Sequence, residues 1–338
     1  MRAVSTILCF VAMLSGQGVL FAQNLAPAAK QFLQSLSAEQ KKLAQFPVDS
    51  DERSNWHMIP RTRRGVCYKN LSEAQRSQAL SLLRESLSTQ GYTKSYDIMK
   101  NEALLRELEG RAESDTYRDP LNYYLSFFGE PTETGNWGWR FEGHHLSLNL
   151  FSSKGSVKSS TPTSMGSNPG VVPSGKEKGR ELLKQETHLA FTLVNALDDQ
   201  QKRICIFSAT APPELVTLGV RNAELLEPKG IPFGQLTGEQ KRLATELLRV
   251  YVSNYSDEFS AELNKRLESE GIDKLTFAWA GSLKPGSWHY YRIQSSFLLI
   301  EYDNTQNNAN HVHVAVRDLT RDFGNDILRE HYRTEHNK

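Results

Sequence analysis

The chain has 338 residues, of which 40 are lysine or arginine, 39 are acidic and 38% are hydrophobic. This near-neutral balance excludes the large basic excess that binding along a nucleic-acid backbone requires, so we expect a small-molecule partner instead. Three cysteines are too few for a disulfide framework, and a chain of this length can bury a sufficient core without one.

The first 22 residues have the three parts of a secretory signal peptide. Arg2 supplies the basic start, residues 7–14 form an apolar run, and Ala22 is a small residue at the expected cleavage point. The polar and glycine residues at 15–18 end the run before it reaches the roughly 20 residues of a membrane span. We therefore expect cleavage after Ala22 and export to the periplasm or the cell exterior.

Cleavage would remove Arg2 and Cys9, which leaves 39 basic and 39 acidic residues in the mature chain. The two remaining cysteines, Cys67 and Cys205, could pair in an oxidising compartment or stay free. No later segment reaches the length of a membrane span. The sequence thus predicts a neutral, globular, exported protein.

One short pattern recurs four times and predicts four helix starts. Leucine is followed by Ser, Asp or Thr and, three residues later, by Gln, at residues 36–40, 71–75, 197–201 and 236–240. This is the spacing of a capping box, in which the first polar side chain and the glutamine satisfy free backbone N–H groups. Four helices are expected to begin at these positions.

The stretches that follow two of these starts resemble each other. Residues 71–88 and 236–253 align without a gap, share several leucines and predict amphipathic helices, while residues 139–149 and 291–301 match as strands. Recurrence of this kind is typical of an internal repeat. We interpret the chain as two similar halves that form one compact domain.

The halves are expected to span residues 24–175 and 176–338. The first includes residues 152–175, which are rich in Ser, Gly, Pro and Lys and predict a mobile connection. Residues 181–197 predict a helix. Helices and long antiparallel strands in blocks favour an α+β fold, and without a Walker loop or a GxGxxG motif a nucleotide cofactor has no support.

Two histidines near the C-terminus carry the strongest chemical signal. His311 and His313 alternate with valines, so on a strand both imidazoles point to one face, about 6 to 7 Å apart. If Glu301 pairs opposite His313 in an antiparallel hairpin, Asp303 lies opposite His311 and all four side chains share a face. Histidines with a carboxylate predict a zinc, iron or copper site, and histidines satisfied by neighbouring amides are the alternative.

A second histidine pair lies at residues 144 and 145, where we expect a strand. His144 then shares a face with three leucines and is expected to be buried, whereas His145 shares the polar face of Ser147 and Asn149. We therefore predict that His145 from the first half joins the metal ligands of the second half, as a ligand or a proton carrier.

A third cluster joins a histidine to several arginines. His57 and Arg61 lie within residues 55–64, where they could act as a proton carrier and an anion clamp, or else form an ordinary charged surface. Trp137, Trp139 and Arg292 are the further candidates for substrate binding.

Four motifs, at residues 55–61, 137–149, 291–313 and 322–332, resemble the bacterial and fungal family known as domain of unknown function 3500. The resemblance covers nearly the whole mature chain and implies its boundaries, but it implies no activity. The polar stretch at residues 152–160 looks longer than the family pattern.

We predict an exported metal-dependent enzyme, either a hydrolase or an oxidoreductase. His311 and His313 are the expected ligands of a divalent transition metal, zinc, iron or copper, with Glu301 or Asp303 as a further ligand or a general base. His145 and His57 are the expected proton carriers. The alternative is a binding protein without turnover, in which the tryptophans, Arg292 and the Asn-rich loop hold a sugar or an anion.

Overall fold

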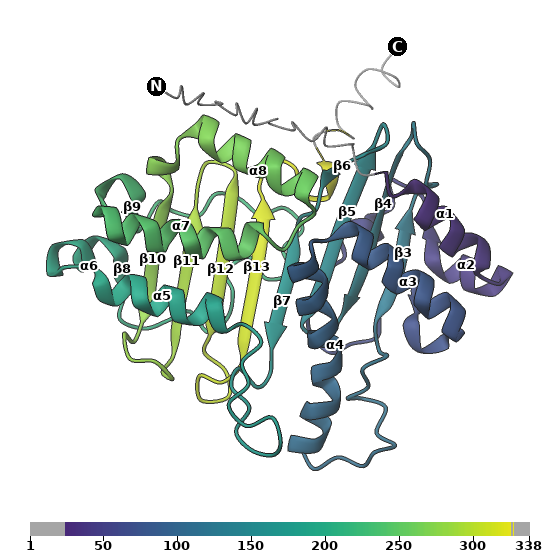
Figure 1. Ribbon diagram of the computed structural model, residues 1–338. Coiled ribbons are helices and arrows are strands. Elements are labelled where there is room, and N and C mark those ends of the chain that lie inside the picture. Colours follow the sequence, from purple (N-terminus) through teal and green to yellow (C-terminus); the bar gives the residue numbers. More distant parts are fainter. Residues whose placement is uncertain (1–23, 326, 328–338) are drawn as a thin grey trace, which may run out of the picture.

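The computed structural model describes residues 24–325 and residue 327. The expected signal peptide and the tail histidines His331 and His336 lie outside the described residues. The described chain folds around one 13-stranded, mostly antiparallel sheet with helices packed on it, which confirms the α+β class (Figure 1). None of its helices is long and apolar enough to cross a membrane.

The sheet runs in the order β1-β3-β4-β5-β7-β13-β12-β11-β10-β8, with β2, β6 and β9 beside β3, β5 and β10. Only β1 with β3 and β8 with β10 pair in parallel, so β7 and β13 meet as antiparallel neighbours at the centre. The strands are β1 (Gln45–Phe46), β2 (Val66–Cys67), β3 (Tyr124–Phe128), β4 (Asn136–Gly143), β5 (Leu146–Ser153), β6 (Ser156–Ser159), β7 (Thr163–Ser167), β8 (Ile206–Ser208), β9 (Ile231–Pro232), β10 (Thr276–Gly281), β11 (His289–Gln294), β12 (Leu298–Asn304) and β13 (Val312–Asp318).

The main helices gather on one face of the sheet, which we call the helix face (Figure 1). They bury apolar stripes: Leu243, Leu247 and Tyr251 lie one helical turn apart on α7 and all enter the core. The helices are α1 (Ala26–Ser35), α2 (Ala38–Ala44), α3 (Glu73–Ser86), α4 (Thr89–Leu108), α5 (Lys184–Ala196), α6 (Asp199–Cys205), α7 (Gly238–Val252) and α8 (Asp257–Glu270). The predicted helix at residues 181–197 is confirmed as α5.

All four predicted capping boxes form, at the starts of α2, α3, α6 and α7. The glutamines of these boxes also meet in pairs: the amide of Gln75 donates to Gln40 at 3.0 Å, and those of Gln201 and Gln240 donate to each other at 2.8 Å. Each pair therefore ties two helix starts together.

Connecting segments cover the opposite face, which we call the loop face. Trp56 and Met58 from one segment and Leu215 from another pack there against Ala315 of β13. The predicted alternation of β13 is confirmed, because its valines enter the helix-face core while His313, Ala315 and Arg317 occupy the loop face. The histidines therefore lie away from the main apolar core.

The hairpin of β12 and β13 differs from the expected register by two residues. Asp303 lies opposite His313 and Glu301 opposite Ala315, because residues 307–309 adopt positive φ angles and widen the turn. The backbone N–H of His311 donates to Asn304 across this turn. An even shift keeps the side chains on the expected face, which a shift of one residue would not.

Two further expectations are corrected. Residues 139–149 form a hairpin and not one strand, because Gly143 pairs with Leu146 and leaves the two histidines between them as the turn. Residues 152–175 contain the end of β5 and the strands β6 and β7, which are largely buried, instead of a mobile connection. Cys67 and Cys205 are both free.

Candidate metal centre

Four histidines from distant parts of the sequence meet on the loop face at the end of the sheet where β13 begins, its lower end in Figure 1. His144 and His145 come from the turn between β4 and β5, and His311 and His313 come from the start of β13. We call these four residues the histidine cluster. The central pairing of β7 with β13 brings them together, since β5 lies directly beside β7.

The turn that carries His145 is strained. His145 has a φ of 60°, a value that residues with a Cβ atom adopt at a cost of roughly 1–2 kcal/mol. Two backbone bonds hold it there: its N–H donates to the carbonyl of Met58, and its carbonyl accepts from Gly166. The surrounding chain thus fixes an imidazole in an unfavourable backbone conformation, as functional sites often do.

The rings of the cluster lie close enough to share a ligand. The Nε2 atoms of His145 and His311 are 2.7 Å apart, and one ring nitrogen of His144 lies within 4.8 Å of both residues' nitrogens. A metal at about 2.0–2.1 Å from two imidazoles holds their nitrogens roughly 3.3 Å apart. A small opening of this pair would therefore accommodate a cation.

Two rings of the cluster, those of His145 and His311, are uncharged at neutral pH. Burial and the neighbouring imidazoles lower the pKa of His311 to about 3 and hold the pKa of His145 well below its usual value. The neutral imidazole is the protonation state that binds metals. The Nδ1 atom of His311 is buried and has no hydrogen-bond partner among the described residues.

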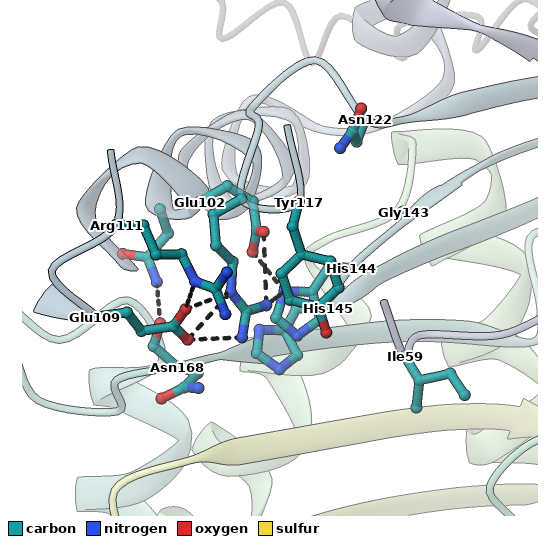
Figure 2. A network of polar contacts seen from close by, with 12 residues as sticks. Ile59, Glu102, Glu109, Arg111, Tyr117, Asn122, Gly143, His144, His145 and Asn168 are labelled. Carbon is teal, nitrogen blue, oxygen red and sulfur yellow. Dashed lines mark hydrogen bonds and ion pairs between the residues drawn. The ribbon is translucent and has the colours of Figure 1, made fainter. Parts of the chain in front are cut away.

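A carboxylate orients His144, which Figure 2 shows beside His145. Glu102 of α4 accepts from its Nδ1 at 2.5 Å, and Arg118 lies 3.2 Å from the same nitrogen while also binding Glu109. Because Glu102 occupies Nδ1, Nε2 is the ring nitrogen that a metal would use. Carboxylate–histidine pairs of this kind are typical around metal centres.

A second group lies directly beside the first. Glu214, Asp303 and His313 each place a ligating atom within 4.8 Å of the others, and the His313 ring lies 4.6 Å from that of His311. Glu214 accepts from Nδ1 of His313 at 2.8 Å. Burial and the charge of Glu214 raise the pKa of Asp303 to about 7. We call these three residues the carboxylate group.

Residues 21–325 match the family described as protein of unknown function, DUF3500. The chain belongs to the DUF3500 family. No curated protein matches it, and no solved structure does. The resemblance seen in the sequence motifs is thus confirmed, and the site of this DUF3500 chain has to be interpreted from its own geometry.

A cavity of about 350 Å³ opens beside the histidine cluster. His144 and Glu102 lie in its wall, together with Tyr117, Asn122 and the exposed Arg61. The substrate-binding candidate Arg61 of the DUF3500 chain therefore lines the same cavity as His144. A small molecule in this cavity would meet both a guanidinium and the ring of His144.

Glu301 does not join either group. Its carboxylate accepts from the backbone N–H groups of Val216 and Thr217, from the Thr217 hydroxyl and from the Tyr290 hydroxyl. These four donors occupy the lone pairs that a metal would need. Glu301 instead anchors the covering segment on the loop face, which corrects its expected role as a ligand or base.

The remaining candidates also lie elsewhere. Trp137 and Trp139 are buried in the helix-face core and not in a substrate pocket, because they alternate along β4 with residues of the loop face. Arg292 is buried and donates to the carbonyl of Glu227. His57 bonds to Asn55, outside both groups. Structural partners thus account for all four.

Sequence reasoning missed three residues of the site: Glu102, Arg118 and Glu214. Only Glu102 carries a local signal, because it falls between Ile98 and Leu105 on the buried stripe of α4 and is an acid where an apolar residue is expected. Glu214 and Arg118 lie in irregular segments, where no periodic pattern predicts which face a side chain occupies.

Proposed function

We propose that this DUF3500 protein is an exported metal-dependent enzyme, and that its reaction is a hydrolysis. The observation that carries the proposal is the buried histidine cluster, in which ring nitrogens of His144, His145 and His311 converge. Three imidazoles with a position left open form the donor set of catalytic zinc sites. We assign the metal to these three residues.

The surroundings favour hydrolysis. A metal held there would supply a Lewis acid and lower the pKa of a bound water. Asp303 next to it is a group that exchanges a proton near neutral pH, since its pKa is about 7. Glu102 holds the ring of His144 in one orientation. The site thus combines a metal position that would bind water with a carboxyl group that can accept its proton.

We place the substrate in the cavity beside His144. Arg61 at its rim forms no ion pair with an acidic side chain of the described chain, so its guanidinium is available to bind a carboxylate or phosphate of the substrate. The cavity volume of about 350 Å³ suits a small molecule and not a folded partner.

An oxidoreductase is the second candidate, because imidazole nitrogens suit copper and iron as well as zinc. The identity of the bound metal separates the two reactions. A zinc ion, which has no redox chemistry, favours hydrolysis, whereas a copper or iron ion favours oxidation.

Metal analysis and activity test the proposal together. Protein purified without a histidine tag is expected to contain a transition metal and to hydrolyse p-nitrophenyl acetate or bis(p-nitrophenyl) phosphate. Replacement of His145 by Asn, which tolerates a positive φ, should remove the activity and the metal held by the histidine cluster without unfolding the protein. A protein that binds no metal and shows an unchanged melting temperature in chelator would instead be a binding protein.

We also infer that the chain arose by internal duplication. The strand order from each edge of the sheet to its centre is similar in the two halves: β1-β3-β4-β5-β7 and β8-β10-β11-β12-β13. The first two strands of each series pair in parallel. The two pairs of glutamine-linked capping boxes support the same division. The histidine cluster then joins side chains from both halves.

Export is a separate proposal that rests on the first 22 residues. Sequencing of the mature N-terminus is expected to begin at Gln23 after expression in a host with a secretion pathway. A chain that keeps Met1 and stays with the cytoplasmic fraction would contradict it.

A further inference from the structure

Buried acidic side chains in this protein are matched with cations. Eight are buried among the described residues: Glu52, Glu102, Glu142, Glu186, Glu301, Asp303, Asp318 and Asp322. Six of them form an ion pair with an arginine or a lysine. This is the expected pattern, because a buried carboxylate without a counter-charge is costly.

The two exceptions, Glu301 and Asp303, lie on the same strand but differ in their partners. The carboxylate of Glu301 accepts hydrogen bonds from four N–H and O–H donors. Asp303, fully buried, accepts from one side chain, the hydroxyl of Thr305, and no lysine or arginine of the described chain pairs with it. Asp303 is therefore the buried acid whose charge the described residues leave unmatched.

A second carboxylate faces the same place. Glu214 lies within 4.8 Å of Asp303, and its side chain is 24% exposed, so the group has a route to solvent. Glu214 also forms no ion pair with lysine or arginine; it accepts from His313, from the amide of Gln306 and from the N–H of Leu215. Two acids converge where the described chain provides one imidazole and no permanent cation.

We propose that the carboxylate group, Glu214, Asp303 and His313, binds a second divalent metal ion beside the one assigned to His144, His145 and His311. The inference rests on the proposed metal function and deepens it to a two-metal centre. The contact between the His311 and His313 rings, 4.6 Å between centroids, makes the two sites neighbours. Paired metals of this kind clamp both oxygens of a displacement reaction.

The two sites prefer different metals. Two carboxylates and one imidazole form a harder donor set than three imidazoles, so the carboxylate group accepts manganese as well as zinc, whereas the histidine cluster favours zinc or copper.

Metal counting with matched variants tests the proposal. The full mature protein, without a histidine tag and stripped by a chelator, is dialysed against zinc and the bound metal is measured by mass spectrometry. We expect two zinc ions per chain in the wild type and one in Glu214→Gln and in Asp303→Asn. The control Asp273→Asn, an exposed acid paired with Lys241, should keep two. Circular dichroism confirms that each variant is folded.

The outcomes separate this inference from the proposed function. One zinc in the wild type that Asp303→Asn retains and His145→Asn loses would overturn the second site and leave the first intact. One zinc that Glu214→Gln loses and His145→Asn retains would support the carboxylate group and overturn the assignment of the histidine cluster. No zinc in the wild type would overturn both assignments.

Discussion

The two ends of β13 place buried ionisable groups on the loop face and satisfy them in opposite ways. At the C-terminal end, Arg317 binds Asp322 at 2.5 Å and donates to three carbonyls. At the N-terminal end, His311 and His313 meet other imidazoles and carboxylates, with no arginine or lysine paired to Asp303 or Glu214 among the described residues.

The difference separates a structural site from a binding site. At the arginine end, the chain provides every charge and every donor, so nothing remains for a ligand. At the histidine end, neutral rings and an unmatched carboxylate offer lone pairs and negative charge without a permanent cation. We conclude that the histidine end is adapted to receive a cation from solution.

The largest expected effect is at the arginine end. Replacing Arg317 by Met leaves the buried carboxylate of Asp322 without its partner, so the free energy of unfolding should fall by about 3–5 kcal/mol. Urea denaturation monitored by circular dichroism measures the loss. A loss of under about 1 kcal/mol would mean that this end is not held by its ion pair.

At the histidine end, metal binding should stabilise the fold. With metal at a hundred times its dissociation constant, the gain is about 2.7 kcal/mol, and chelator should remove it from the wild type. The variants His145→Asn and His311→Asn should lose the part of this gain that comes from the histidine cluster and keep the part that comes from the carboxylate group. If the wild type had the same melting temperature with metal and with chelator, the histidine end of β13 would not be a metal site, and the proposed difference between the two ends would be wrong.

A smaller effect is expected from the residue that orients His144. Glu102→Gln should weaken metal binding roughly 10- to 100-fold, because the amide holds the ring less firmly than the carboxylate. Competition with a chromophoric chelator measures the affinity. The control Glu107→Gln changes an exposed acid on the same helix and should leave the affinity unchanged.

The smallest effect concerns pH in the metal-free protein. The lowered pKa of His311, about 3 against 6.5, makes stability fall as pH drops below about 6.5. The raised pKa of Asp303, about 7 against 3.8, acts in the opposite direction, since its stabilising contribution is lost as pH rises towards 7. The two effects partly cancel in the wild type.

Asp303→Asn removes the second effect alone. Its stability should therefore fall more steeply than that of the wild type between about pH 7.5 and about pH 4.5, as measured by urea denaturation at each pH. Parallel profiles for the two proteins would show that Asp303 does not take up a proton on folding in this range.

The sequence predicts local features well and predicts contacts between residues far apart in the chain poorly. The four capping boxes and the alternation of β13 were predictable because each depends on residues three or two positions apart. The shared face of Asp303 and His313 was also predictable, since the register error was even. A local pattern therefore locates His311 and His313 on the correct face of the sheet.

What the sequence could not predict are partners that only the fold brings together. Glu102 meets His144 across 42 residues, and Glu214 meets His313 across 99. The turn at His144 and His145 was missed because it lacks the Asn-Gly or Asp-Gly signal of a two-residue hairpin. His145 adopts the positive φ that a glycine would normally supply in such a turn. Its backbone hydrogen bonds to Met58 and Gly166 hold it in that conformation.

The central claim is that the histidine end of β13 holds a metal, and anomalous X-ray diffraction from crystals grown with zinc tests it most directly. We predict a peak at the zinc edge within about 2.3 Å of ring nitrogens of His145 and His311, with the two nitrogens about 3.3 Å apart. A crystal without such a peak, in which the two rings keep a direct hydrogen bond, would contradict the account.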